Sequence, residues 1–421
     1  MALDLTVRGM RDFYPELYSR LLHIVDAWRR TALSYGFEEF EGPILETLEL
    51  YTIKSGEEIV NQLYTFTDKG GRALALRPEL TPTLARMVAK IQGEAMKPIK
   101  WFSTPRCMRY EKPQKGRLRE FFQFNVDLIG EDGPMADLEV ISVAVDSLLA
   151  LGLGEKDFVV KINNRDFVQG YIGGAGIDRE KVSALYKIVD NTRKAGEEAT
   201  RLAIERLGLD AGHREAVERY LALRGAEDLR RLGLTGNGMD SLLELFGLIG
   251  SSGLSAFCEF DPSIVRGLDY YTGTVFEVFD RSESMRAICG GGRYNNLVRE
   301  FGGADIPACG FGMGDVVLGE ILQGKGLIPP YGKKLDYYLV RIDEGGLGPM
   351  FGVARALRKK GCAVEYSYRT APVKKQMARA SKLGAKKVII LGTEEIARGE
   401  AVEKDMATGD EKKTPLSELL S

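Results

Sequence analysis

Apolar residues first recur at helical spacing within residues 15–35, a segment that opens with Pro15. The positions that share one helical face are Leu17, Leu21, Val25, Trp28 and Ala32. A proline in the first turn and an apolar stripe predict an amphipathic helix. From about residue 60 to 130 the pattern changes to short apolar runs between turn residues, as in 62–66 and 121–129. These runs predict strands of an antiparallel sheet.

Between about residues 168 and 255 the helical spacing returns, with many charged residues among the apolar ones, and it predicts an α-helical insertion. The stretch Pro-Pro-Tyr-Gly at 329–332 is typical of a linker. Strand and helix patterns then alternate up to residue 391, which indicates a small α/β domain with right-handed crossovers. We therefore expect a first domain at 1–328, containing the insertion at 168–255, and a second domain at 333–421.

The composition, with 44% hydrophobic and 28% charged residues, is that of a globular protein. No apolar run approaches the ~18–20 residues that cross a bilayer, and the first residues lack a basic segment followed by an apolar one. The five cysteines are scattered without a C-x-x-C pair, which argues against a zinc site and a disulfide framework. We therefore expect no protein-bound metal, no membrane association and a cytoplasmic location.

The only two histidines are His23 and His213, so catalysis or metal binding built on histidine is nearly excluded. Net charge is −2, but from Lys333 onward 18 Lys and Arg stand against 12 Asp and Glu, a net of +6. A basic C-terminal domain suggests that a polyanion docks there. A solvated lysine-rich surface would explain these counts equally well.

Arginines gather in a segment with the pattern strand, basic loop, strand at residues 106–121. Arg109 falls on the first strand, and Arg117 and Arg119 lie beside the loop. Three cations on one hairpin would repel each other unless a polyphosphate neutralised them. Ordinary phosphate loops are absent, because the glycine-rich run at 310–314 lacks the G-x-G-x-x-G spacing and no G-x-x-x-x-G-K-[ST] motif occurs. A surface hairpin with its arginines in water is the alternative.

This hairpin resembles motif 2 of the class II aminoacyl-tRNA synthetases, and the rest of the chain resembles the histidyl-tRNA synthetases. The matching segments are Val-Arg-Gly-Met-Arg-Asp-Phe-Tyr-Pro at 7–15, Leu-Arg-Pro-Glu-Leu-Thr-Pro at 76–82, Arg-Gly-Leu-Asp-Tyr-Tyr-Thr-Gly at 266–273 and Gly-Gly-Gly-Arg-Tyr-Asn at 290–295. The last two resemble the family's histidine-specific motifs. The C-terminal domain resembles the anticodon-binding domain of the histidine, glycine, threonine and proline enzymes. The resemblance covers about residues 7–420.

The resemblance implies both a fold and a reaction. The fold would be an α+β catalytic domain on a six- or seven-stranded antiparallel sheet, with the helical insertion and a C-terminal α/β anticodon-binding domain. The protein would be a homodimer, with residues 37–47 at the interface. Its reaction would activate histidine with ATP to histidyl-adenylate, with Mg²⁺ bridging the phosphates, and then transfer the histidyl group to the 3′ end of tRNA(His). Neither step needs a nucleophile on the enzyme.

By the same resemblance the ATP-binding residues are Arg109, Glu111, Arg117, Arg119 and Phe121. Arg109 and Arg266 would be the catalytic pair that grips the α-phosphate from two sides. Arg117 and Arg119 would contact the β- and γ-phosphates, and Phe121 would stack under adenine. Arginine suits this task because its planar fork matches phosphate oxygens and keeps its charge.

Histidine would be held by a second set, Glu79, Thr81, Gln123, Asp127, Tyr270, Tyr271 and Tyr294. The first three would bind the α-ammonium group, while Asp127 and Tyr271 would meet the two imidazole nitrogens. A neutral imidazole has one donor and one acceptor, so a carboxylate and a phenol hydroxyl satisfy both. Apolar amino acids would leave these groups unpaired and be rejected by a factor of ~10⁴. Core tyrosines and a strand-end carboxylate are the structural alternative.

Two positions depart from the family's pattern. Its last catalytic-domain helix normally begins Gly-x-Glu-Arg, with the arginine over adenine, but Val317 stands in that place here. Loss of a stacked guanidinium would cost ~1–2 kcal/mol, or roughly ten- to thirty-fold in ATP affinity, unless another cation compensates. Asn295, where the family often has Asp, is a milder departure.

The missing arginine keeps a second interpretation open, the regulatory subunit of ATP phosphoribosyltransferase, a relative that binds histidine without activating it. Such relatives tend to lose the catalytic arginines and the tRNA-binding domain. This chain keeps Arg109, Arg117, Arg119 and Arg266 as well as the C-terminal domain, which favours the synthetase. A synthetase for another amino acid is disfavoured because both histidine-specific motifs are intact.

Overall fold

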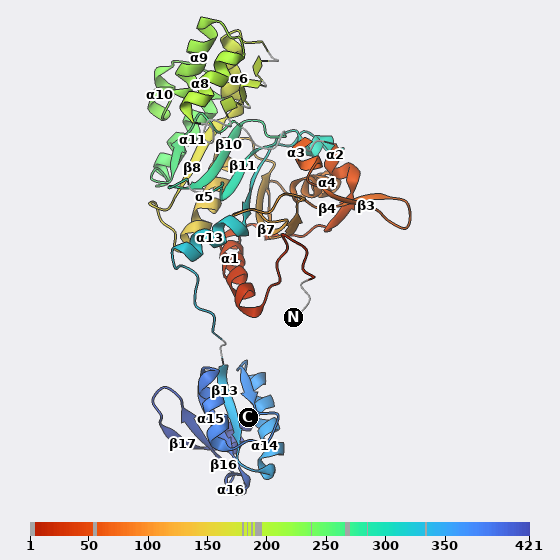
Figure 1. Ribbon diagram of the computed structural model, residues 1–421, viewed down its shortest axis with the longest axis vertical. Helices are drawn as coiled ribbons and strands as arrows, with labels where there is room; N and C mark the ends of the chain where they lie inside the picture. The colour runs from red at the N-terminus through yellow and green to blue at the C-terminus, as the bar shows by residue number, and fades with distance from the viewer. Residues whose placement is uncertain are drawn as a thin grey trace. The chain divides into compact units, whose positions relative to one another are not determined.

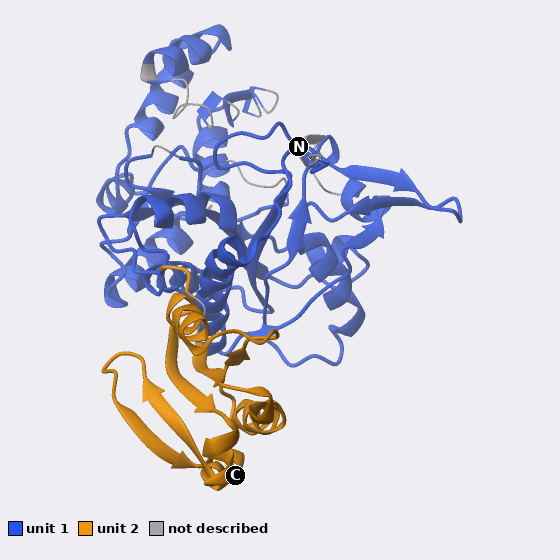
Figure 2. Ribbon diagram, turned by 60° about the horizontal axis from the view of Figure 1, so that its bottom comes forward, with its two compact units in different colours: residues 1–329 blue, residues 330–421 orange. Residues whose placement is uncertain are grey.

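The computed structural model divides into two compact units, residues 1–329 and 330–421, each with its own sheet (Figure 2). The residues described are 5–53, 57–178, 181–182, 184–186, 188–189, 196–236, 238–265, 270–283, 285–332 and 335–421. Among these residues no helix combines the length and the apolar character that a membrane span needs.

The first unit is built on a sheet in the order β1-β5-β7-β12-β11-β10-β8-β9, with β6 paired to β7. The six central strands are β5 (Ile99–Ser103), β7 (Glu120–Ile129), β12 (Ala308–Gly314), β11 (Cys289–Arg293), β10 (Thr274–Asp280) and β8 (Phe158–Asn164). All five pairings among them are antiparallel, which confirms the predicted sheet type.

In the described part of the chain this sheet has nine strands, more than the six or seven predicted. The strands beyond the six central ones are β1 (Glu38–Glu39), β6 (Arg106–Met108) and β9 (Cys258–Phe260). Of these, β6 is the first strand of the predicted hairpin at 106–121, although it ends one residue before Arg109. Strands of two or three residues are too short to leave a periodic pattern in the sequence. The strands β1 and β9 form the edges, and each pairs with its neighbour in the parallel sense.

Three helices pack together on one face of this sheet, α1 (Pro15–Ser34), α5 (Pro134–Leu149) and α13 (Asp315–Gly324) (Figure 1). The predicted N-terminal helix is confirmed as α1. The fully buried ring of Trp28 stacks on Phe124 of β7, with centroids 5.4 Å apart and planes within 9°. The apolar stripe of α1 therefore fixes this helix under the strand that leads to the candidate site.

A small antiparallel sheet stands apart from the main one, in the order β2-β4-β3. Its strands are β2 (Leu45–Thr47), β3 (Tyr64–Thr67) and β4 (Ala73–Leu76), with α2 (Leu48–Thr52) and α3 (Glu57–Val60) in the connection between β2 and β3. The strand predicted at 62–66 is β3, but it belongs to this separate sheet. Helix α4 (Thr81–Ile91) follows β4 and packs against α12 (Leu297–Glu300).

The predicted insertion is helical where it is described. Its helices are α6 (Arg165–Gly174), α8 (Glu197–Arg206), α9 (Ala211–Leu221), α10 (Ala226–Arg231) and α11 (Met239–Ser251). Figure 1 shows α6, α8, α9 and α10 gathered into one group. The fully buried side chain of Tyr220 anchors α9, because its hydroxyl accepts from Asn163 at the end of β8 at 2.8 Å.

The second unit has a five-stranded sheet in the order β14-β13-β15-β16-β17. The predicted strands are β13 (Leu335–Arg341), β14 (Val364–Tyr366) and β15 (Ala385–Leu391), which are parallel, with α14 (Leu347–Lys359) and α15 (Val373–Lys382) between them. The sequence did not predict the antiparallel strands β16 (Glu400–Asp405) and β17 (Glu411–Pro415), since they are dominated by charged residues. The remaining elements are η1 (Glu344–Gly346), α16 (Thr393–Ala397) and α17 (Leu416–Leu420).

Candidate active site

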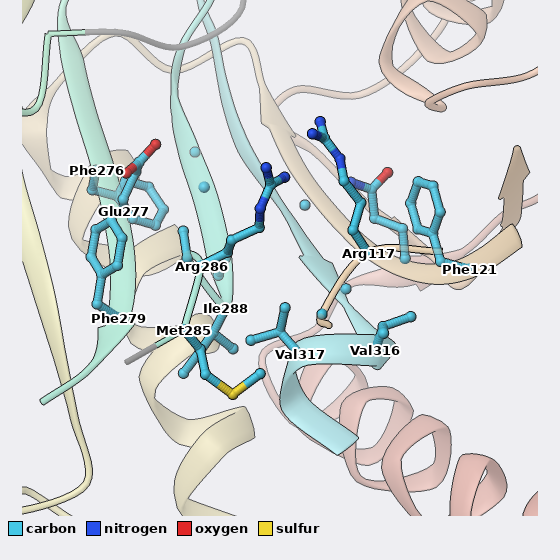
Figure 3. A pocket seen from close by; sticks show the side chains of 18 of the residues that line it. Arg117, Phe121, Phe276, Glu277, Phe279, Met285, Arg286, Ile288, Val316 and Val317 are labelled. Atoms are coloured by element: carbon cyan, nitrogen blue, oxygen red, sulfur yellow. The ribbon is translucent and has the colours of Figure 1, made fainter. Parts of the chain in front are cut away.

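A cavity of about 860 Å³ lies over the main sheet of the first unit. Its walls come from the hairpin between β6 and β7, from β10 and β11 with their connecting loop, and from the start of α13 (Figure 3). Glycines of β11 and β12 keep its floor open. A Cβ at Gly312 would collide with the side chain of Gln123, so glycine is needed for Gln123 to lie across β12.

The predicted basic hairpin is confirmed. Strand β6 pairs antiparallel with β7, and the main-chain N–H of Arg109 donates to the carbonyl of Arg119 at 2.9 Å. Gly116 turns the chain with a φ of +70°, a conformation that favours glycine. Its N–H donates to the carboxylate of Glu320 on α13 at 3.0 Å, which attaches the hairpin tip to the opposite wall.

Arg109 is held in a fixed position on the cavity wall. Its guanidinium carbon lies 5.3 Å from the centroid of the Phe121 ring, and its Nε donates to the carbonyl of Pro78 at 3.0 Å. The positive charge also acts on buried Glu79, whose pKa burial raises and Arg109 lowers. The structure thus places a cation beside an aromatic face that could receive a purine.

The other predicted ATP residues take different positions. Arg117 and Glu111 both line the cavity and form an ion pair. Arg119 is not on the cavity wall, since its Nε donates to the carbonyl of Glu111 at 3.0 Å and its guanidinium covers the ring of Tyr110 at 4.6 Å. Arg266 lies outside the described residues.

Three tyrosines form a packed cluster beside the cavity with the buried side chains of Glu79 and Asp127, a group of residues called the tyrosine pocket. The Tyr270 and Tyr271 rings are 5.1 Å apart and the Tyr270 and Tyr294 rings 5.9 Å apart. The Tyr294 hydroxyl donates to Oδ1 of Asp127, and the Tyr270 hydroxyl donates to Oε2 of Glu79 at 3.1 Å. Tyr271 and Gln123 line the cavity, so the tyrosine pocket borders it. Thr81, buried at the start of α4, lies beside the Tyr270 hydroxyl.

Two acceptors in this pocket are buried without a hydrogen bond from any residue that the structure describes, Oε1 of Glu79 and Oδ2 of Asp127. Burial raises the pKa of Asp127 to about 7, with the Tyr294 hydrogen bond opposing this shift and Glu79 adding to it. Native proteins rarely leave such atoms unpaired. Two buried carboxyl groups with free oxygens therefore favour a ligand that brings two hydrogen-bond donors.

The sequence did not single out several residues that contribute here. Lys115, Glu277 and Arg286 also line the cavity. Arg11 forms an ion pair with buried Asp315 at 2.8 Å, and Oδ1 of Asp315 accepts from the N–H of Phe122 at 2.7 Å, which joins the N-terminal segment to α13 and β7. The sequence showed that these side chains are charged, but it could not predict their positions, because their partners come from distant segments of the chain.

An antiparallel sheet with a basic hairpin, an arginine on an aromatic face and a separate α/β unit match the architecture expected from the resemblance to class II aminoacyl-tRNA synthetases. The histidyl-tRNA synthetase family profile matches residues 9–314, and an anticodon binding domain profile matches residues 349–421. The chain is 41% identical to the histidine–tRNA ligase of Opitutus terrae, over 100% of this chain and 98% of that protein. The chain belongs to the histidyl-tRNA synthetase family.

Solved structures agree with this assignment. The histidyl-tRNA synthetase of Nostoc sp. PCC 7120 superposes with a TM-score of 0.82 at 24% identity, over 99% of both chains. A Bacillus halodurans protein named as an ATP phosphoribosyltransferase regulatory subunit/histidyl-tRNA synthetase superposes with a TM-score of 0.77 at 26% identity, over 93% of this chain and 100% of that one. The predicted family and fold class are therefore confirmed. Full-length matches to proteins named histidine–tRNA ligase favour the synthetase over the regulatory alternative.

Proposed function

We propose that the chain activates histidine with ATP and transfers the histidyl group to tRNA(His), and that both steps occur in the cavity of the first unit. The observation that carries this proposal is the pair of unsatisfied carboxylate oxygens in the tyrosine pocket, next to a cavity lined by Arg109 and Arg117. The hydrogen-bonding groups of the tyrosine pocket suit an amino acid with a polar ring, and the bordering cavity suits a polyphosphate.

The tyrosine pocket would recognise histidine by hydrogen bonds. Oε1 of Glu79, with Thr81 and Gln123, would accept from the α-ammonium group. Oδ2 of Asp127 would accept from one imidazole N–H, and the Tyr271 hydroxyl would donate to the other ring nitrogen. Tyr270 and Tyr294 would pack around the ring and keep the two carboxylates in place through the hydrogen bonds described above. An apolar side chain would leave Asp127 unpaired in a buried site.

Activation would need charge neutralisation more than acid–base chemistry. An oxygen of the histidine carboxylate attacks the α-phosphorus, the bond to the bridging oxygen breaks, and pyrophosphate leaves with that oxygen. Arg109 would neutralise the charge that develops on the α-phosphate, and Arg266 would assist from a second side. In the second step the terminal ribose hydroxyl of tRNA attacks the activated carbonyl and AMP leaves.

The phosphates and adenine would lie along the hairpin. Phe121 would stack under adenine, and Arg117, paired with Glu111, would contact the β- and γ-phosphates. The contacts of Arg119 with main-chain oxygens suit a supporting role in this hairpin. Among the described residues no three His, Cys, Asp or Glu side chains form a metal site. Mg²⁺ would therefore be held mainly by phosphate oxygens, with Glu111 and Glu277 as nearby carboxylates.

The second unit would bind the anticodon arm. The rings of Phe351, Tyr366 and Tyr368 form a ladder with centroids 5.4 Å apart at each step, and Tyr368 is 87% exposed. Arg358 covers Tyr366 at 5.3 Å. Exposed aromatic rings beside cations are suited to stacking unpaired RNA bases. The net charge of +6 from Lys333 onward would add phosphate contacts.

The chain would work as a homodimer in the cytoplasm. Ile44, Leu45 and Phe66 on and beside the small sheet are each between 38% and 46% exposed. Exposed apolar residues that cluster on one face favour a protein interface. Ile44 and Leu45 lie within the predicted interface at residues 37–47, and Phe66 lies outside it.

The test is histidine-dependent exchange of labelled pyrophosphate into ATP. The synthetase must show exchange with histidine and no exchange with the other amino acids. If histidine binds and no exchange occurs, the regulatory-subunit interpretation is correct instead. Exchange with a different amino acid would mean that the tyrosine pocket has been assigned the wrong substrate.

A further inference from the structure

Arg286 extends into the ATP-sized cavity from the loop that connects β10 and β11. Figure 3 shows its side chain above Val317, with Arg117 reaching in from the opposite wall. Arg286 is exposed and has no hydrogen bond or ion pair with any residue that the structure describes. By contrast, Arg109 and Arg117 on the same cavity are held by Pro78 and Glu111. A cation without a protein partner in a cavity is available to an anionic ligand.

The position of Arg286 is close to the helix start that lacks an arginine. A Cβ at Gly116 would lie 3.2 Å from Cγ2 of Val317 and 3.6 Å from Cε of Met285, so the hairpin tip, α13 and the residue before Arg286 meet at one point. Val317 itself is buried and apolar, and it contributes no charge. The β10–β11 loop therefore places the guanidinium of Arg286 close to Val317, the position on α13 that lacks an arginine.

The loop is anchored ahead of Arg286, so the arginine does not hang from a free segment. Oδ1 of Asp280 accepts from the N–H of Met285 at 3.3 Å, and Glu283 pairs with Lys161 at 2.6 Å. Glu283 has a φ of +49°, the only positive φ of a non-glycine residue in the described part of the chain. Such a conformation persists where surrounding contacts enforce it.

We propose that Arg286 binds the β- and γ-phosphates of ATP and provides the cation that helix α13 lacks. This inference rests on the proposed function, because it assumes that the cavity receives ATP. The guanidinium of Arg286 enters from the β10–β11 loop and that of Arg117 from the hairpin, so the triphosphate is clamped between two walls. Charge-assisted hydrogen bonds of this kind are lost completely when the side chain is truncated.

The test compares Arg286→Ala, Arg286→Lys and the control Arg281→Ala in pyrophosphate exchange. Arg281 lies in the same loop, does not line the cavity, and donates to the carbonyls of Glu155 and Ala256 at 2.5 and 2.7 Å. For Arg286→Ala, we expect KM for ATP and for pyrophosphate to rise roughly 10- to 100-fold, the range for one charged hydrogen-bonding partner. KM for histidine should stay within about twofold. Arg286→Lys should fall between, and Arg281→Ala should match the wild type.

An unchanged KM for ATP and pyrophosphate in Arg286→Ala would overturn the inference. So would an equal rise in KM for histidine, because it would indicate a general structural defect. Calorimetric titration of the wild type and Arg286→Ala with Mg-ATP and with AMP tests the inference even without turnover. Only the affinity for ATP should be lower in Arg286→Ala than in the wild type. A wild-type protein that binds Mg-ATP but shows no exchange would contradict the proposed function. In that case the calorimetric titration alone would still test whether Arg286 binds the phosphates.

Discussion

Replacing Asp127 by Asn should stabilise the ligand-free protein and at the same time damage histidine recognition. Asp127 is buried at the end of β7, its Oδ1 accepts from Tyr294, and its Oδ2 has no partner among the described residues. Burial therefore disfavours the charged form of Asp127 in the ligand-free protein. An amide has nearly the same shape and carries no charge.

The size of the effect follows from the pKa of Asp127, which burial raises from 3.8 to about 7. Three pH units at about 1.36 kcal/mol each give about 4 kcal/mol for keeping this carboxylate charged in the folded protein. Because the folded pKa is the higher one, Asp127 favours folding below pH 4 and loses this contribution as pH rises through 7. The stability advantage of Asp127→Asn should therefore grow by about 3 kcal/mol between pH 5 and pH 8. An unpaired amide N–H would subtract about 1–3 kcal/mol at every pH.

The assay is urea unfolding of the wild type and Asp127→Asn at pH 5 and pH 8, without and with saturating histidine. Histidine should reduce the pH dependence of the wild type, because an imidazole N–H stabilises the carboxylate. In the exchange assay KM for histidine should rise roughly 10- to 100-fold in the variant, since a charged hydrogen bond is lost. A stability difference that is the same at both pH values, or an unchanged KM for histidine, would refute this reasoning.

Three further variants test other parts of the account. Arg109→Ala should lower kcat for exchange by at least about 100-fold, because it removes a group that stabilises developing charge. Histidine affinity, measured by calorimetry, should stay within about threefold of the wild type. Comparable losses in kcat and in histidine affinity would contradict a catalytic role for Arg109. Trp28→Ala should lower the free energy of unfolding in urea by about 3–5 kcal/mol, because the ring that stacks on Phe124 is fully buried, and a loss under 1 kcal/mol would contradict this packing. Tyr368→Ala should raise KM for tRNA about fivefold or more and leave pyrophosphate exchange unchanged; an unaltered KM for tRNA would exclude the aromatic ladder from RNA binding.

The elements that the sequence predicted correctly are those whose pattern is local and long. Helix α1 has twenty residues and strand β7 has ten, so an apolar period or run is visible in each. The basic hairpin was also predictable, because a charged loop between two apolar runs can hardly fold otherwise. Strands β16 and β17 were missed because charged residues dominate both, so neither shows a clear apolar alternation in the sequence, and β17 is an exposed edge of its sheet.

The site was predictable in its composition and less so in its geometry. Motif resemblance brought Glu79, Asp127 and the tyrosines together, although they are up to about 200 residues apart in the chain. It could not show that the Arg119 side chain turns to main-chain oxygens, because that choice depends on which carbonyls the folded hairpin presents. Nor could it show Arg286, whose proposed role depends on the loop conformation that contacts of Asp280 and Lys161 support.

The most direct test of the central claim is a crystal structure of the protein with histidine and a non-reactive ATP analogue. We expect an imidazole nitrogen about 3 Å from Oδ2 of Asp127, the ammonium group at Oε1 of Glu79, and the α-phosphate at Arg109. Histidine bound outside the tyrosine pocket would contradict it. So would an analogue bound elsewhere while Arg109 and Arg117 point into bulk solvent.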